Sequence, residues 1–279
     1  MKRFMLLVCP LVFAGAAMAQ SSARLAFETV KVPSGSLRLK AYLWKPSGPG
    51  PFPAVLFNHG RSDNPQQHTT GSAKVLGPVF AKHGYVLLYL FRRGEGLSAD
   101  QGKFIGDLLQ QDEAAKGRDA RNHLQTTLLT TDHLDDAQAG LSYLKGLPYV
   151  DAHRVAVAGH SFGGQLTVLM AAQDQNVRAA VAFAPAAASW EGSPELRELL
   201  LDAVRKIKVP VMFLQAANDY SLTPTQAMAE EMSRLGKKNV RNVYRAVGAR
   251  AAEGHNFVYT DVGLWEQDVF RFLEENVKR

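Results

Sequence analysis

Short apolar runs alternate with amphipathic stretches along most of the chain. Apolar runs bounded by turn residues are typical of strands buried on both faces of a sheet, and they occur at 54–57, 85–91, 154–158, 177–183, 209–214 and, more weakly, 240–247. Apolar positions recur at helical spacing over 132–147, 224–235 and 261–277. Strands alternating with helices predict right-handed crossovers and an α/β fold, in which helices cover both faces of a mostly parallel central sheet.

Two segments depart from this alternation. Residues 25–32 and 37–44 are rich in apolar and β-branched side chains and are separated by Pro33-Ser34-Gly35-Ser36, which predicts an N-terminal β-hairpin. Residues 99–130 are polar with a helical pattern, and they form either a small lid or an N-terminal extension of helix 132–147; we favour the extension. Because we find neither an internal repeat nor a dividing linker, we expect a single domain over 20–279 with a small lid or none.

Residues 1–19 have the pattern of a secretory signal peptide. Lys2 and Arg3 precede an uncharged stretch, and Ala17-Met18-Ala19 supplies the small residues of a cleavage site. The apolar run is shorter than the roughly 20 residues that span a membrane. We therefore predict cleavage after Ala19 and export to the periplasm or the exterior, with no membrane span afterwards. The alternatives are an uncleaved anchor and, less favoured, a lipoprotein linked through Cys9, beyond which the apolar stretch continues.

Composition narrows the possible functions. An apolar content of 46% in 279 residues excludes a disordered chain. Cys9 is the one cysteine, so the exported protein can form neither an internal disulfide nor a cysteine zinc site. Removal of Lys2 and Arg3 reduces the formal charge of +6 by two. The remaining basic residues are scattered and histidines do not cluster with carboxylates, so we expect no nucleic-acid partner, no metal and no other cofactor. The oligomeric state stays open.

Candidate chemistry begins at Gly159-His160-Ser161-Phe162-Gly163, which matches the pattern G-x-S-x-G. The match is informative because strand 154–158 precedes it and a predicted helix at 165–172 follows. A serine at such a strand-to-helix turn exposes its hydroxyl above the sheet. The start of the helix also offers backbone N–H groups to a developing oxyanion.

A nucleophilic serine needs a base, and the base needs an orienting carboxylate. Asp219 follows the buried run 209–214, and His255 lies between the last strand and the final helix. A turn-capping aspartate and a loop histidine are plausible separately, but the order Ser161, Asp219, His255 favours a catalytic triad. The other histidines are assigned to turns beside the site (His59 and His160) or to the surface (His68, His83, His123, His133 and His153).

An oxyanion hole needs two N–H donors aimed at one point. Phe162 is one candidate, and Arg61, in the segment Asn58-His59-Gly60-Arg61-Ser62 after strand 54–57, is the other. We expect His59 to support this loop. For Arg92 and Arg93, we favour an ion pair with a nearby acid such as Glu95 that stiffens their own loop. The side chain of Arg61 is the better candidate for contacting an acidic substrate.

These motifs together resemble the α/β-hydrolase superfamily, and within it the dienelactone-hydrolase-like esterases and the catalytic domains of prolyl-oligopeptidase-type peptidases. The resemblance extends over most of the chain after the signal and rests on Asn58-His59-Gly60, Phe91-Arg92-Arg93-Gly94-Glu95-Gly96-Leu97-Ser98, Gly159-His160-Ser161-Phe162-Gly163-Gly164, Asp219 and Gly254-His255-Asn256-Phe257.

The resemblance implies that Ser161 is the nucleophile, His255 the base, Asp219 its orienting carboxylate, and Arg61 and Phe162 the oxyanion donors. The dienelactone enzymes proper use a cysteine nucleophile, so Ser161 puts that particular lactone substrate in question. We predict an exported serine hydrolase that cleaves small carboxylic esters through an acyl-enzyme. The alternatives are a serine peptidase, an acyltransferase and, less favoured, a non-catalytic binding protein on the same fold.

Overall fold

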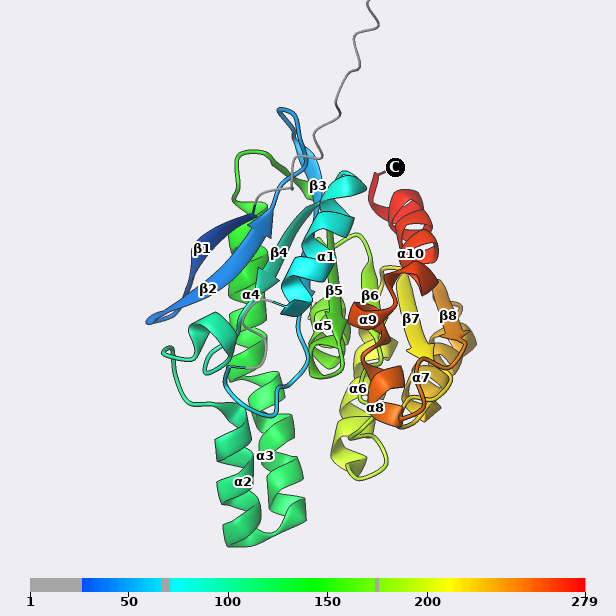
Figure 1. Cartoon of the computed structure of the whole chain (residues 1–279). Coiled ribbons are helices and arrows are strands. Elements are labelled where there is room, and N and C mark those ends of the chain that lie inside the picture. Colours follow the sequence, from blue (N-terminus) through cyan, green and yellow to red (C-terminus); the bar gives the residue numbers. More distant parts are fainter. Residues whose placement is uncertain (1–26, 67–70, 174–175, 279) are drawn as a thin grey trace, which may run out of the picture.

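The computed structural model describes residues 27–66, 71–173 and 176–278 (Figure 1). The predicted signal peptide at 1–19, including Cys9, lies outside the described residues, and so does His68.

Within the described residues, eight strands form one sheet in the order β1-β2-β4-β3-β5-β6-β7-β8. The strands are β1 (Phe27–Ser34), β2 (Leu37–Trp44), β3 (Phe52–Asn58), β4 (Val86–Leu90), β5 (Val150–His160), β6 (Ala180–Phe183), β7 (Val211–Ala216) and β8 (Asn239–Tyr244). The first three strands of the sheet order pair antiparallel, and all other neighbours are parallel. The mostly parallel sheet and the N-terminal hairpin are both confirmed.

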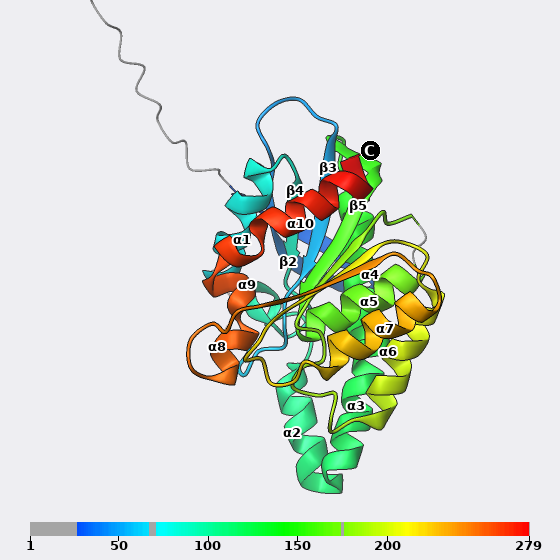
Figure 2. The ribbon, with the colours of Figure 1, turned by 90° about the vertical axis from the view of Figure 1, so that its right-hand side faces the viewer.

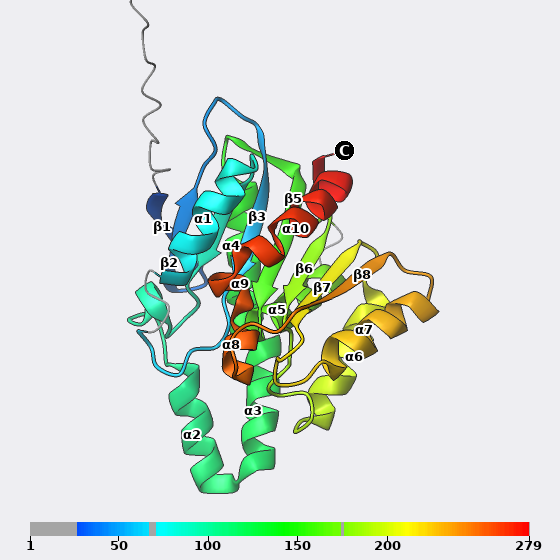
Figure 3. The ribbon, with the colours of Figure 1, turned by 45° about the vertical axis from the view of Figure 1, so that its right-hand side comes forward.

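Helices cover the two faces of the sheet, as Figures 2 and 3 show. One face carries α1 (Gly71–Lys82), α9 (Phe257–Thr260) and α10 (Glu266–Leu273). The other carries α4 (Asp132–Lys145), α5 (Phe162–Gln173), α6 (Pro194–Lys206) and α7 (Thr223–Arg234). The remaining helical segments are α2 (Ile105–Lys116), α3 (Arg118–Thr130), α8 (Ala251–His255), η1 (Gly96–Ser98), η2 (Val262–Leu264) and η3 (Glu274–Lys278).

Strand side chains alternate between two apolar cores, one on each side of the sheet. In β3, Ala54 and Leu56 pack with α4 and α5, whereas Val55 and Phe57 pack with α1, α9 and α10. All four side chains are fully buried. A parallel strand covered on both faces must be apolar at consecutive positions, which explains the continuous runs in the sequence.

Among the covering helices, α1, α6 and the short α9 were not predicted from the apolar pattern. Helix α1 contains Gly77 and Pro78, and both residues disfavour a helix interior. Packing explains the glycine, because a Cβ there would collide with the indole ring of Trp44. Helix α6 begins at a cap, where the Ser193 hydroxyl accepts a hydrogen bond from the Leu196 N–H at 3.3 Å.

Residues 99–130 contain two antiparallel helices, α2 and α3, which project beyond the carboxyl ends of the parallel strands (Figure 1). Helix α3 leads into α4 through Thr131, whose N–H donates to the Thr127 carbonyl at 3.1 Å and whose carbonyl accepts from Asp135 at 2.9 Å. Helix α2 folds back along α3. The segment therefore combines an extension of α4 with a hairpin placed beside the strand ends.

Candidate active site

Ser161 is the single residue between β5 and α5, and it stands in a sharp turn. Its φ is 55°, and its N–H donates to the Phe183 carbonyl at 2.9 Å. Glycine is required on both sides, because a Cβ on Gly159 would collide with the Gly163 carbonyl, and one on Gly163 with the Asn58 carbonyl. The turn therefore holds Ser161 at the carboxyl edge of the sheet in a backbone conformation that few residues other than glycine adopt.

Three side chains that are distant in sequence form one hydrogen-bonded chain at this edge. The Ser161 Oγ lies 2.9 Å from Nε2 of His255, and Nδ1 of His255 lies 2.7 Å from Oδ1 of Asp219. The Asp219 side chain is fully buried, and the His255 side chain is 10% exposed. With the Asp219 carboxylate as acceptor, Nδ1 carries the imidazole proton and Nε2 accepts from the Ser161 hydroxyl.

Asn218 connects the two segments that carry Asp219 and His255, a role that was not predicted from the sequence. Its Nδ2 donates to the carbonyls of Val247 at 3.0 Å and Arg250 at 3.2 Å, and its Oδ1 accepts the Val247 N–H at 2.9 Å. Gly254 fits against it, because a Cβ there would collide with the Asn218 amide oxygen. An asparagine directly before a candidate aspartate is a weak signal, because asparagine is common in turns.

The two predicted N–H donors come from two different segments beside Ser161. Phe162 is the first residue of α5, and the first N–H groups of a helix have no partner within it. Arg61 belongs to the loop after β3, and a Cβ on its neighbour Gly60 would lie 3.3 Å from the Ser161 Cβ. Both residues line the same pocket as Ser161 and His255.

This pocket has a volume of about 220 Å³ and is lined largely by polar side chains. Arg61 and Asp63 come from the loop after β3, and Arg121 and Gln125 come from α3. Burial lowers the pKa of Arg121, and the nearby positive charge of Arg61 lowers it further. Helix α3 thus forms one wall of the pocket, although its sequence carries no motif that indicates this.

The two adjacent arginines of the loop after β4 form separate ion pairs. Arg92 contacts Glu95 at 3.0 Å, and both side chains are fully buried, which confirms the favoured interpretation. Arg93 contacts Asp136 and Asp132 on α4, each at 2.7 Å. Neither arginine lines the pocket around Ser161.

The expectation that His133 lies at the surface is wrong. His133 is only 2% exposed, and its ring meets Phe162 edge-to-face at a centroid distance of 5.3 Å. Burial lowers its pKa well below the ordinary value, and the charges of Arg92 and Arg93 add to this. The sequence pattern was misleading because α4 is covered by other elements at this position.

Over residues 27–66, 71–173 and 176–278, we find no group of three or more histidine, cysteine or acidic side chains arranged to hold a metal ion. In the same part of the chain, no helix combines the length and the apolar character needed to cross a membrane.

The sheet order, the covering helices and the serine at the strand-to-helix turn define the α/β-hydrolase fold. The model of the dienelactone hydrolase family matches residues 39–262. The chain therefore belongs to the dienelactone hydrolase family, a family of hydrolases.

Among curated relatives, the chain is 30% identical over 169 residues to a polyketide transferase of a Penicillium species. The aligned segment covers 58% of this chain and 50% of the relative. The chain spans about half the length of the curated relatives it matches.

Among solved structures, an esterase of Pyrococcus furiosus is similar with a TM-score of 0.65 at 15% identity, covering 91% of this chain and 92% of the esterase. The acylaminoacyl peptidase of Pyrococcus horikoshii is similar with a TM-score of 0.64 at 17% identity, covering 91% of this chain and 42% of the peptidase. At these identities the likeness concerns the fold.

Proposed function

We propose that this protein is a serine hydrolase that cleaves small carboxylic esters through an acyl-enzyme. The observation that carries the proposal is the continuous hydrogen-bonded chain from the Ser161 hydroxyl through His255 to buried Asp219. A serine is a weak nucleophile at neutral pH unless an adjacent base accepts its proton, and this arrangement supplies the base.

In this mechanism, Nε2 of His255 accepts the hydroxyl proton as the Ser161 Oγ attacks the ester carbonyl carbon. Asp219 stabilises the imidazolium that forms. The N–H groups of Phe162 and Arg61 hold the negative oxygen of the tetrahedral intermediate, and one such donor contributes about 3 kcal/mol in other enzymes. His255 then protonates the leaving alcohol, and water releases the acyl group by the reverse sequence.

Labelling with a fluorophosphonate probe, combined with hydrolysis of short p-nitrophenyl esters, tests this proposal. We expect the wild type to label once and to hydrolyse, and Ser161→Ala to do neither. Ser142→Ala, which changes an exposed serine of α4, is the matched control and retains both properties. Turnover by Ser161→Ala at the wild-type rate, or a wild type without labelling, would contradict the proposal.

The pocket favours substrates that carry an anionic group beside the ester. Arg61 and Arg121 contribute two positive charges to the pocket lining and Asp63 one negative charge. Arg121 also lies 3.8 Å from Glu113, but its pKa is lowered because burial and the charge of Arg61 outweigh that contact. An anion would relieve the repulsion between the two guanidinium groups. We expect Arg121→Gln to raise KM about 5- to 10-fold for a p-nitrophenyl hemisuccinate and less than 2-fold for p-nitrophenyl propionate. Equal effects on the two esters would exclude this preference.

Acyl transfer is a second candidate, because one relative is a polyketide transferase. The same three side chains serve transfer when an alcohol, rather than water, attacks the acyl-enzyme. Product analysis in the presence of a short alcohol separates the two, since a hydrolase yields mainly the free acid. Anilide substrates in the same screen test peptidase activity, which the resemblance to acylaminoacyl peptidases keeps as an alternative.

We also propose that the protein is exported after cleavage behind Ala19, on the basis of the pattern at residues 1–19. Mass spectrometry of the protein from the producing cell tests this. A mature N-terminus at Gln20 is expected, and an intact Met1 on the exported protein would refute it.

A further inference from the structure

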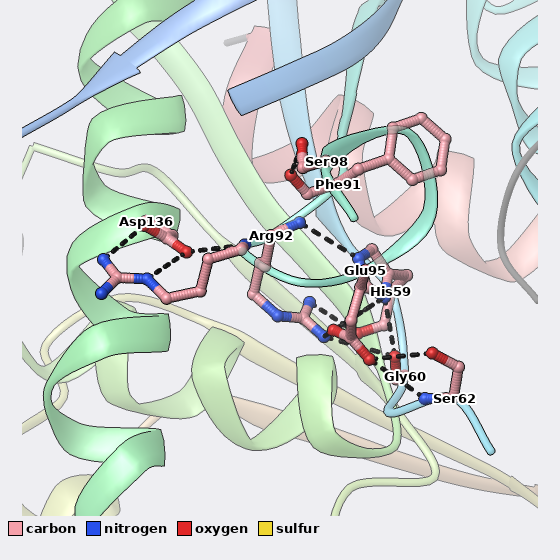
Figure 4. A network of polar contacts seen from close by, with 9 residues as sticks. His59, Gly60, Ser62, Phe91, Arg92, Glu95, Ser98 and Asp136 are labelled. Atoms are coloured by element: carbon pink, nitrogen blue, oxygen red, sulfur yellow. Dashed lines mark hydrogen bonds and ion pairs between the residues drawn. The ribbon is translucent and has the colours of Figure 1, made fainter. Parts of the chain in front are cut away.

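The loop that carries Arg61 has no regular secondary structure, so other contacts must hold its backbone. An N–H donor in an oxyanion hole is effective only within a few tenths of an ångström of its proper position, about 2.7–3.1 Å from the negative oxygen. The polar groups around Arg61 therefore determine whether its N–H can serve in catalysis. Figure 4 shows these groups.

The backbone is held on both sides of Arg61 by one buried ion pair. On the N-terminal side, the Arg92 guanidinium donates to the carbonyls of His59 at 2.8 Å and Gly60 at 3.3 Å. On the C-terminal side, Glu95 Oε1 accepts from the Ser62 N–H at 3.2 Å and from the Ser62 hydroxyl at 2.9 Å. The other carboxylate oxygen of Glu95 accepts from Arg92 at 3.0 Å, which links the two sides.

His59 completes this arrangement in one tautomer. Its Nδ1 lies 2.7 Å from the Gly60 carbonyl, and its Nε2 lies 3.4 Å from the Arg92 N–H. A neutral imidazole with its proton on Nδ1 donates to the Gly60 carbonyl and accepts at Nε2. The Arg92 Nη2, 3.2 Å from Nδ1, then donates to Gly60 and Glu95 and not to the ring. His59 thus ties Gly60 to the loop after β4, which agrees with the supporting role expected for it.

The same guanidinium also contacts the side chain of Phe162, the residue whose N–H is the second proposed donor. The Arg92 Cζ lies 5.4 Å from the centre of the Phe162 ring, within the range of a cation–π contact. Arg92 therefore contacts the neighbours of Arg61 and the side chain of Phe162 at once. Arg93, the next residue, donates through its backbone and side chain to Asp136 on α4 and makes none of these contacts.

We propose that Arg92 and Glu95 are positioning residues that set the Arg61 N–H, and the spacing between Arg61 and Phe162, for the oxyanion. This inference rests on the proposed function. It assigns the buried pair a part in transition-state stabilisation, although neither side chain touches the substrate.

Steady-state kinetics of Glu95→Gln tests this inference, with Arg93→Lys as the matched control from the same loop. Glutamine keeps an acceptor for Ser62 but weakens the hold on Arg92. We expect kcat for p-nitrophenyl propionate to fall about 10- to 100-fold, with KM changed less than about 3-fold. Inhibition by an alkyl trifluoromethyl ketone, whose hemiketal oxygen occupies the oxyanion hole, should weaken by a similar factor. Arg93→Lys should change each value less than about 3-fold.

Ser62→Ala provides a second test of the inference if Glu95→Gln does not fold. It removes one hydrogen bond and leaves both buried charges paired, and kcat should fall about 3- to 10-fold at an unchanged fraction of sites labelled by saturating fluorophosphonate.

Full kcat and unchanged ketone inhibition in Ser62→Ala and in any folded Glu95→Gln would overturn the inference while leaving the proposed function intact. If the variants lowered only the fraction of sites that fluorophosphonate labels, with kcat per labelled site unchanged, the inference would also be overturned, because the pair would then serve only folding. A wild type that neither labels nor hydrolyses overturns both.

Discussion

Two regions meet at the Ser161 pocket, and they are built in different ways. In the triad region, which comprises Ser161, His255 and Asp219, the His255 ring contacts both other side chains, and each residue lies in or beside a turn at the carboxyl end of the sheet. In the oxyanion-loop region, residues 59–62, the backbone is held by hydrogen bonds from the buried Arg92–Glu95 pair, which does not itself line the pocket.

The two regions differ in how a substitution affects activity and stability. Under the proposed function, replacing one triad side chain removes chemistry. The buried Asp219 carboxylate still accepts hydrogen bonds from the Gln215 side chain at 2.8 Å and the Tyr220 N–H at 2.7 Å, so the loss of His255 or Ser161 leaves its charge with partners. Replacing Glu95 leaves a buried guanidinium without its counter-ion, so the fold itself is affected. We therefore expect mutations in the triad region to change activity at nearly constant stability, and mutations in the oxyanion-loop region to change both.

Asp219→Asn is expected to have the largest effect. An asparagine there favours the wrong tautomer of His255, and the equivalent change in a serine protease lowers kcat about 10⁴-fold. Ester hydrolysis at saturating substrate measures the loss, and thermal unfolding should show a midpoint within about 3 °C of the wild type. A loss of less than about 10-fold would contradict the role assigned to Asp219.

Glu95→Ala should mainly affect stability. The variant buries the Arg92 charge without its partner, and breaking a buried pair in this way costs about 3–5 kcal/mol of unfolding free energy. Urea unfolding measures the cost. A change below about 1 kcal/mol would show that the oxyanion-loop region tolerates loss of the pair, and the contrast with the triad region would then fail.

His133 makes the stability of this part of the molecule depend on pH. It contacts Phe162 beside Ser161 and lies near Arg92 of the buried ion pair. Its pKa is lowered in the folded protein, so below about pH 6.5 the unfolded chain binds a proton that the folded protein does not. Stability is therefore lost as pH falls from about 6.5 towards the lowered pKa, by at most about 1.4 kcal/mol per pH unit. Urea unfolding at pH 7.0 and 5.5 measures how much unfolding free energy is lost between the two pH values. We expect this loss to be about 1 kcal/mol smaller in His133→Gln than in the wild type. An equal loss in the two proteins would contradict the role of His133.

Asp132→Ala should have the smallest effect. Asp132 pairs with Arg93 at 2.7 Å, but its side chain is 48% exposed, and Arg93 keeps its contacts with Asp136. An exposed ion pair contributes about 0–1 kcal/mol, so the unfolding free energy should fall by less than about 1 kcal/mol. A loss as large as that of Glu95→Ala would mean that burial does not distinguish the two arginine pairs.

Much of the fold followed from local pattern. The strands were placed correctly because buried parallel strands need consecutive apolar residues, as in β3 and β4. Helices α1 and α6 were missed, in α1 because Gly77 and Pro78 interrupt a helical pattern that packing on Trp44 nevertheless stabilises. The antiparallel pairing of α2 with α3 also gave no clear signal, since both helices are largely polar.

The sequence by itself determined the α/β architecture and brought Ser161, Asp219 and His255 forward as candidates, because strand ends of one parallel sheet meet at one edge and the three residues follow those ends in order. Only the tertiary structure decided that Arg92 and Glu95 hydrogen-bond to residues 59–62 and that α3 lines the pocket. It also decided that Asn218 holds the loop before His255 and that His133 is buried. Each of these depends on contacts between segments far apart in the chain, and burial is a property of the packed whole that no local pattern specifies.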